Sequence, residues 1–178
     1  VGGRYTKNDN SGDWATSNGG IGAINRPPLK PLSEFKDFEL RPIAMSDPVM
    51  KDEDKVKISE ELGTKLNARI TPLLNDWRAH KGKSVEGSVL IIEPIVQKLQ
   101  VVSGAARFWL GAMMGDSSID LDLKLTDAVT KQVIATPRLQ QNAGAWGGAW
   151  SIGATDRNLL DYVTDIAHRY LEVNYTKQ

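Results

Sequence analysis

Strict alternation of apolar and polar residues near the middle of the chain limits the possible folds more than any other feature. From residue 119 to residue 126 the two kinds follow each other without a break: Ile119, Asp120, Leu121, Asp122, Leu123, Lys124, Leu125 and Thr126. Successive side chains of a β-strand point to opposite faces of its sheet, so the pattern predicts a strand with one dry and one wet face. Asp127 to Lys131 is predicted to turn the chain, and Gln132 to Thr136 to return as the hairpin partner up to Pro137.

Two further segments are predicted to be strands. Phe38 and Leu40 alternate with charged residues and predict a half-buried strand that ends at Pro42. Residues 89–92 are all apolar, which is typical of a strand covered on both faces. Pro94 predicts a bulge or an edge position in this second strand, after which the chain is expected to stay extended.

Two segments carry the pattern of amphipathic helices. Asp52 or Asp54 can cap the first helix, and Pro72 is expected to kink or divide it. The second helix is predicted to run from Asp156 to about Asn174. Apolar residues form a stripe at helical spacing in both: Ile58, Leu62, Leu66, Ile70, Leu73 or Leu74 and Trp77 in the first, and Leu159, Val163, Ile166, Ala167 and Tyr170 in the second.

The predicted elements occur in the order β-α-β-β-β-α, with a polar loop at residues 46–54 before the first helix. This order predicts an α+β fold: a mainly antiparallel or mixed sheet of about four to five strands with two helices packed on one face. Residues 1–33 are rich in Gly and Pro and carry few apolar groups, so we expect an extended N-terminal arm or tether. Residues 34–178 are predicted to form a single α+β domain.

Composition excludes several classes of function. The chain has 22 Lys and Arg against 22 Asp and Glu, and this balance argues against nucleic acid as a partner. It contains no Cys, which excludes disulfides, thiolate metal sites and a cysteine nucleophile in these residues. Two His cannot form a three-His metal site, and no apolar run is long enough to cross a bilayer as a helix.

No metal or cofactor site follows from the residue pattern. The oxygen-rich residues 8–13 lack the bidentate Glu of a calcium loop. Asp116, Asp120 and Asp122 offer further carboxylates, but the last two are expected to be solvated on the wet face of their strand. The glycines at residues 147–153 fit neither a P-loop nor a dinucleotide fingerprint. We therefore predict no cofactor and no metal.

The residues also predict no catalytic site. His168 lies close to Asp165 in the sequence, and such a pair could do acid–base chemistry. Asp161, Asp165 and Arg169 at four-residue steps are more simply a solvent-facing charge ladder on one helix. Because the sequence contains no other group of residues typical of a catalytic site, we expect that the protein is not an enzyme.

Two Gly-rich segments, residues 103–117 and 142–155, flank the predicted hairpin and are expected to meet at one end of the sheet. The first contains a run of Phe, Trp, Leu and Met, which is unusual for a solvated loop and which could alternatively be a buried strand. Exposed aromatic and Met side chains mark contact surfaces. The predicted interaction surface, for a protein partner, a membrane interface or another copy, consists of Phe108, Trp109, Met113, Met114, Trp146 and Trp150.

Five stretches of sequence carry a resemblance to a known family: FKDFEL from Phe35, VLIIEP from Val89, RFWLGAMMGDSS from Arg107, LKLTDAVTKQVIA from Leu123 and the final ATDRNLLDYVTDIAHRYLEVNY. With them the chain resembles a family of uncharacterised bacterial envelope proteins, described as lipoproteins with a domain of unknown function. It is more distantly similar to the periplasmic α/β domain at the amino terminus of TolB and to the periplasmic α/β domains of curli secretion channels. Lys131 stands where this family commonly has Gly, which bears on the type of turn.

The resemblance implies an envelope location and protein–protein contact, and it implies no reaction. A lipid anchor would require a modified Cys upstream of Val1. We expect a non-enzymatic, periplasm-facing binding or assembly module of the bacterial cell envelope, in the periplasm or at the outer membrane, that contacts other protein subunits and forms homo-oligomers. Two alternatives remain open: a small-molecule-binding protein or weak enzyme with a Gly-rich pocket, and a structural subunit of a filament or secretion apparatus.

Overall fold

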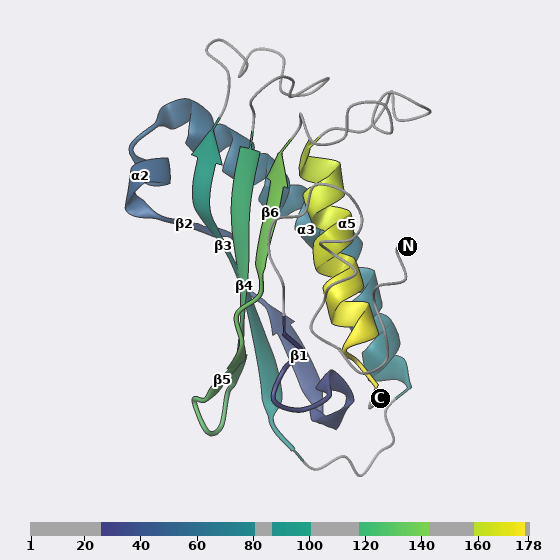
Figure 1. Cartoon of the computed structure of the whole chain (residues 1–178). Coiled ribbons are helices and arrows are strands. Elements are labelled where there is room, and N and C mark those ends of the chain that lie inside the picture. The colour runs from purple at the N-terminus through teal and green to yellow at the C-terminus, as the bar shows by residue number, and fades with distance from the viewer. Residues whose placement is uncertain (1–25, 81–86, 101–117, 143–158, 177–178) are drawn as a thin grey trace.

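The computed structural model of the protein describes residues 26–80, 87–100, 118–142 and 159–176 (Figure 1). It has an α+β fold in which two main helices accompany a mixed six-stranded sheet, and the predicted fold class is confirmed. The elements are a short 3-10 helix η2 (Leu32–Glu34), β1 (Asp37–Leu40), β2 (Ala44–Met45), α2 (Asp47–Met50), α3 (Glu53–Ala79), β3 (Val89–Gln100), β4 (Ser118–Asp127), β5 (Val133–Ala135), β6 (Arg138–Asn142) and α5 (Leu159–Val173).

The sheet is built around β3 and β4, which are its two longest strands and pair antiparallel. β1 and β2 pair in parallel with successive parts of β3, while β5 and β6 pair antiparallel with successive parts of β4. Each outer edge therefore consists of two short strands, and the chain between them contains a proline, Pro42 or Pro137. Short, proline-interrupted edges are poor templates for adding another strand. β2 and β6 were not predicted, because such short strands show no periodicity of their own.

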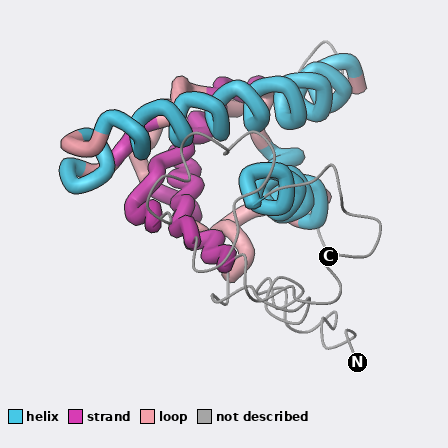
Figure 2. The backbone as a smooth tube through the Cα atoms, turned by 90° about the horizontal axis from the view of Figure 1, so that it is seen from above, coloured by secondary structure: helices cyan, strands magenta, loops and turns pink. Residues whose placement is uncertain are grey.

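Both long helices cover the same face of the sheet (Figure 2). α3 packs on β1 and β3, α5 packs on β4 and β6, and the two helices contact each other. The predicted apolar stripes form the helical side of the core, since every member except Leu73 is buried. From the sheet they meet the alternate residues of the strands: Phe38, Leu90, Ile92, Val96, Leu121, Leu123 and Leu125.

Two expectations about the first helix need correction. α3 runs from Glu53 to Ala79 without a break, so the predicted division at Pro72 is wrong. Proline removes one backbone hydrogen bond, but Ile70 and Leu74 on either side of it are buried and hold both halves on the sheet. The loop expected at residues 46–54 contains the short helix α2, and it is Asp52 whose carboxylate caps α3 through the amides of Asp54 and Lys55.

Pro94 lies inside β3, opposite the gap between the two short strands of that edge. The carbonyl oxygens of Ile92 and Val96 accept hydrogen bonds of 2.9 Å from the amides of Arg41 and Ser46. Alternate residues of a strand direct their backbone groups to the same side, so Pro94 also faces the β1–β2 edge. The missing N–H of Pro94 therefore removes no hydrogen bond from the ladder. Because β3 is paired on both sides, it is not an edge strand, and the β-bulge lies further along it, between Val96 and Lys98; the predicted edge position or bulge at Pro94 is therefore wrong. The gap between β1 and β2 is what accommodates the proline.

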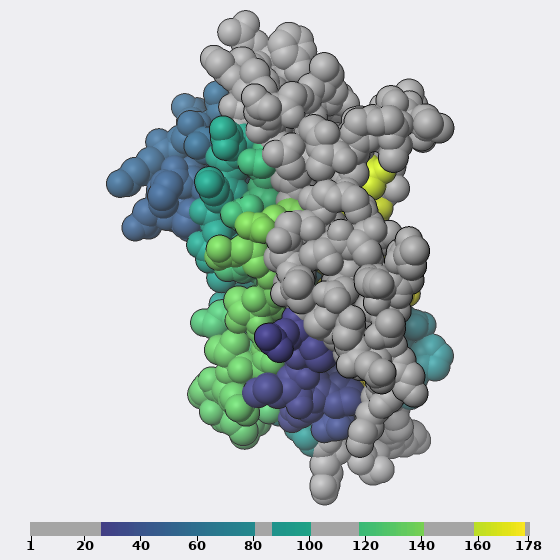
Figure 3. Space-filling view, in the orientation of Figure 1, coloured from purple at the N-terminus to yellow at the C-terminus, as the bar shows by residue number. Residues whose placement is uncertain are grey.

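The face of the sheet opposite the helices is only partly covered. Val89 and Ile91 lie on it and are half-buried, so the expectation of a strand covered on both faces is wrong for them. Charged residues share this face, because Glu93 of β3 lies opposite Lys124 of β4. Figure 3 looks onto this side of the molecule, where parts of the strands reach the surface. The apolar residues of β3 thus lie on two faces of the sheet. One face is buried against the helices, and the other is partly exposed and shared with charged residues.

Residues 26–33 lie against the last part of the chain. The Tyr170 hydroxyl donates a hydrogen bond of 2.7 Å to the carbonyl oxygen of Arg26. The amides of Leu32 and Ser33 bond the carbonyl oxygens of Asn174 and Tyr175 at 3.0 and 2.7 Å. Burial raises the pKa of the Tyr170 hydroxyl, which stays protonated and keeps its donor role. These bonds tie the start of the described chain to α5.

Asp127 organises the turn between β4 and β5. Its carboxylate accepts hydrogen bonds from the amides of Val129 and Thr130 at 2.9 and 3.1 Å. Hydrogen bonding from the Ser88 hydroxyl and from these amides lowers the pKa of Asp127 to about 2. Lys131 closes the turn with a φ of 64°, in the left-handed region. The predicted hairpin is confirmed. Lys131, the position where the resembling family commonly has Gly, also has the backbone conformation that favours Gly.

Replacing Lys131 with Gly should therefore raise the free energy of unfolding by about 0.5–1 kcal/mol, because Gly adopts this backbone without steric cost. Replacing it with Val should lower the free energy of unfolding, since β-branched residues are strained at positive φ. Urea unfolding of both variants measures the difference. Equal stabilities for Lys131→Gly and Lys131→Val would contradict the turn geometry.

Candidate functional site

Both Gly-rich segments are attached at one end of the sheet, and the second returns to the described structure at Leu159, the first residue of α5. Gln100 at the end of β3 lies opposite Ser118 at the start of β4, and Ser118 lies opposite Asn142 at the end of β6. These three residues are three of the four described neighbours of residues 101–117 and 143–158, and these three points of attachment lie together. The prediction that the two segments themselves meet concerns residues outside the described ranges. The predicted interaction surface itself lies outside the described residues: Phe108, Trp109, Met113, Met114, Trp146 and Trp150.

A cavity of about 580 Å³ lies next to this end of the sheet. It begins where a β-bulge interrupts the pairing of β3 with β4, between Val96 and Lys98. Bulges re-aim side chains and are common beside functional sites. We call this cavity the bulge pocket; it is lined by Pro48, Val49, Lys55, Gln97, Lys98, Leu99, Gln100, Asp120 and Arg138.

An ion pair between neighbouring strands fixes one wall of the bulge pocket. The Arg138 guanidinium of β6 donates from Nε and Nη2 to the two carboxylate oxygens of Asp122 on β4, at 2.7 and 2.9 Å. The bond to Asp122 and the nearby Asp120 carboxylate raise the pKa of Arg138. Asp122 is only 6% exposed, so its expected place as a solvated carboxylate is wrong. The alternation identified its face of the sheet, but its partner comes from a strand that shows no sequence signal.

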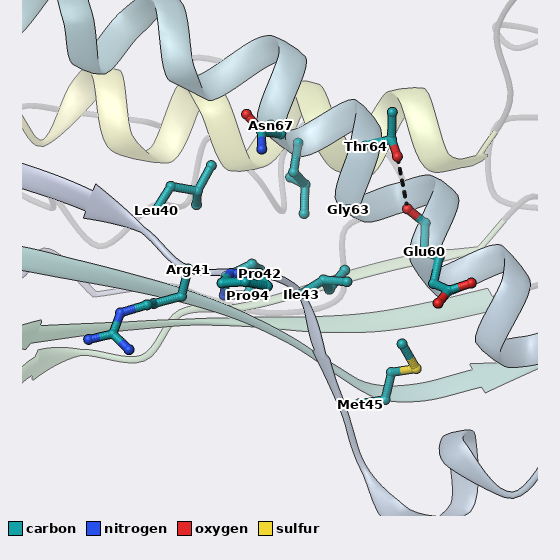
Figure 4. Close-up of a pocket in the computed structure, with 11 residues that line it drawn as sticks. Leu40, Arg41, Pro42, Ile43, Met45, Glu60, Gly63, Thr64, Asn67 and Pro94 are labelled. Atoms are coloured by element: carbon teal, nitrogen blue, oxygen red, sulfur yellow. Dashed lines mark hydrogen bonds between the residues drawn. The ribbon is translucent and has the colours of Figure 1, made fainter.

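A second cavity, of about 410 Å³, lies where α3 crosses the β1–β2 edge (Figure 4). Gly63 of α3 faces Ile43 here, and a Cβ at Gly63 would lie 2.8 Å from Cγ2 of Ile43. Of the polar lining residues, Arg41 points away from the cavity and pairs with Glu39. Thr64 donates its hydroxyl hydrogen to the backbone carbonyl of Glu60. The cavity is thus a gap beside a close backbone approach, with few polar groups converging on it.

Adding a methyl group at Gly63 should destabilise the protein by about 0.5–1.5 kcal/mol, because the clash with Ile43 exceeds the gain in helix propensity. In an Ile43→Ala background the same Gly63→Ala change should instead stabilise by about 0.5–1 kcal/mol. Chemical denaturation of the four proteins of this cycle tests the contact. A stabilising effect of Gly63→Ala in both backgrounds would show that Ile43 does not restrict the site.

Comparison with known proteins identifies the domain. A family described as a domain of unknown function (DUF4410) matches residues 31–148. The chain belongs to this family. No curated protein matches it. The dodecamer of a single-residue variant of PelC from Paraburkholderia phytofirmans has a similar fold: TM-score 0.50, 12% identity, 90% of this chain and 99% of that chain covered. A second PelC dodecamer structure from the same organism gives a TM-score of 0.41 with the same identity and coverage.

The DUF4410 match includes every residue that lines the two cavities, and it ends before α5. Both cavities therefore lie within the part of the chain that the family matches. Among the described ranges, no group of three or more His, Asp or Glu residues is placed to hold a metal ion. In the same ranges no helix is long and apolar enough to cross a membrane.

Charged residues join the two long helices. Lys65 of α3 contacts Asp161 of α5 at 2.9 Å, and Arg69 contacts Asp165 at 3.4 Å. The expectation of a solvent-facing ladder is therefore wrong for the two aspartates, which bridge to α3. Half-buried His168 lies beside this seam, and the structure pairs it with Glu172 at 4.0 Å. The sequence could not show the seam, because the partners are about a hundred positions apart.

Burial and the nearby Arg69 guanidinium lower the pKa of His168 below its usual value of 6.5. The unfolded chain then takes up a proton at this residue before the folded chain does, so stability is lost as the pH falls below about 6.5. In a His168→Gln variant the slope of stability against pH between 7.5 and 5 should be smaller. Urea unfolding across this range tests it, with His80→Gln as the control. An unchanged slope in His168→Gln would contradict the assignment.

Proposed function

We propose that the protein is a non-enzymatic assembly module of the bacterial cell envelope, exposed to the periplasm, whose copies associate with one another. The carrying observation is the common attachment of both Gly-rich segments at one end of the sheet. Together these segments hold the six residues of the predicted interaction surface. Two segments that start side by side can present their apolar residues as one contact area.

The architecture of the sheet supports contact through this end. Both outer edges consist of short strands interrupted by proline, which disfavours assembly by adding strands edge to edge. The fold is shared with a protein solved as a dodecamer, and the alignment covers nearly all of both chains. A head-to-tail contact between identical subunits closes into a ring when the rotation allows it. We extend self-association to this chain on these grounds.

The envelope location rests on the resemblance to lipoprotein-like envelope proteins and to the periplasmic domains of TolB and curli secretion channels. On this proposal an anchor would lie upstream of Val1 and would hold the domain near a membrane. The domain would then act by binding other subunits and would catalyse no reaction.

In-cell cross-linking tests the proposal. Cells that express the full-length gene product are treated with a membrane-impermeant and, separately, with a permeant amine-reactive cross-linker, and are then fractionated. After permeabilisation of the outer membrane alone, the impermeant reagent should give a ladder at multiples of the monomer in the envelope fraction. Protein found only in the cytosolic fraction, or only as a monomer with both reagents, would overturn it.

A further inference from the structure

The bulge pocket has the chemistry of a binding site, independently of self-association. We propose that it binds a small anion that carries a carboxylate or phosphate group. Its volume of about 580 Å³ lies within the usual range for small-molecule pockets. The proposal concerns residues of the described domain and does not depend on the Gly-rich segments or on the oligomeric state.

Cations from three separate elements converge on this pocket: Lys55 from α3, Lys98 from β3 and Arg138 from β6. The structure gives neither lysine an ion-pair partner among the residues it describes. Of the lining residues only Asp120 is acidic, and it lies opposite Lys98 across the strand pair. Asp122 lies next to the lining and neutralises Arg138, so the pocket and its ion pair together keep a small excess of positive charge from the lysines. This excess favours an anion over a cation.

One of these cations, Lys55, occupies a position that structure alone does not favour. Lys55 is half-buried in the first turn of α3, where the positive end of the helix dipole disfavours a cation. Lys98 follows the β-bulge that interrupts the central strand pair; it lines the pocket, is exposed and lies opposite Asp120 of β4. Residues that break a local rule without a structural gain are expected at functional sites.

The third cation is held in place. Both carboxylate oxygens of Asp122 orient the Arg138 guanidinium, which keeps one charged wall of the pocket rigid. Gln97 and Gln100 add amide groups, and buried Val49 and Leu99 add an apolar floor. A ligand would fit this arrangement if its anionic group lay near the two lysines. The rest of the ligand, polar or apolar, would contact the glutamine amides and the apolar floor.

Binding is tested with inorganic phosphate and malonate, titrated at constant ionic strength into the whole chain and followed by amide chemical shifts. At least one anion should give saturable shifts in residues 97–100 and 120. Lys55→Gln/Lys98→Gln should weaken this binding at least tenfold, while Lys51→Gln/Lys57→Gln, with the same loss of charge outside the pocket, should change it less than twofold. Melting temperatures confirm that both double variants fold.

Phosphate and malonate distinguish a phosphate site from a carboxylate site, and saturation by either one supports the proposal. The absence of saturable shifts with both anions would overturn it. Equal weakening in the two double variants would also overturn it, because it would show a general charge effect. Self-association is measured separately by mass, so its failure leaves this result unaffected.

Discussion

Removal of the Arg138 guanidinium should be among the most destabilising single changes in the domain. An Arg138→Ala variant is expected to lose about 2–3 kcal/mol of unfolding free energy. The change leaves Asp122, only 6% exposed on the central strand β4, without the two hydrogen bonds that stabilise its carboxylate. An uncompensated buried charge costs about 3–5 kcal/mol, and we take a smaller value because Arg138 itself is 47% exposed and water can reach the gap.

Equilibrium unfolding in guanidinium chloride measures this loss. Arg138→Lys should be intermediate, because lysine keeps the charge but cannot form the two parallel bonds. Asp122→Asn in the Arg138→Ala background should recover most of the loss, since it removes the unpaired charge. A change below about 0.5 kcal/mol in Arg138→Ala, or no recovery in the double variant, would show that the pair contributes little to the fold.

A second large effect is expected from the predicted interaction surface. Phe108→Ser/Trp109→Ser should convert the assembly into monomers of 19.6 kDa without unfolding the domain. Large aromatic residues supply most of the binding free energy in many protein interfaces. The loss of two of them should therefore remove enough binding free energy for the subunits to dissociate. Size-exclusion chromatography with light scattering measures the mass, and circular dichroism checks the fold.

The opposite end of the sheet offers a matched control. Leu29 and Val129 are 68% and 74% exposed, and both lie near the β4–β5 hairpin, whose turn is at the other end of β4. Leu29→Ser/Val129→Ser also removes two exposed apolar side chains, but it should leave the mass unchanged. Dispersal of the assembly by this control, or an unchanged mass in Phe108→Ser/Trp109→Ser, would place the contact elsewhere.

Local sequence patterns predicted most of the core. The alternation from Ile119 to Leu125 gave the central strand, and the helical stripe from Ile58 to Trp77 gave the buried face of α3, because both periods reflect one covered face. The turn residues gave the hairpin after Asp127. The predicted division at Pro72 was wrong because local propensity ignores packing: the buried residues on both sides keep the helix continuous.

The site could be predicted only in part, because its parts are brought together by long-range pairing. Their positions beside the hairpin predicted that the two Gly-rich segments meet at one end of the sheet; the structure describes their attachment there, and the segments themselves lie outside the described residues. The bulge pocket did not, since Lys55, Lys98 and Arg138 come from three distant elements and β6 has no periodic signal. The burial of Asp122 is likewise decided by Arg138 across the strand pair, and the wet face of an alternating strand gives no sign of it.

The central claim is that copies of this chain assemble, and the molar mass of the purified protein tests it most directly. Light scattering coupled to size exclusion, over a hundredfold range of concentration, should give a particle of several copies, with a mass that is an integer multiple of 19.6 kDa. Dissociation toward the monomer should appear only at the lowest concentrations. A mass of one chain at every concentration, in the folded protein with residues 101–117 and 143–158 intact, would contradict the account.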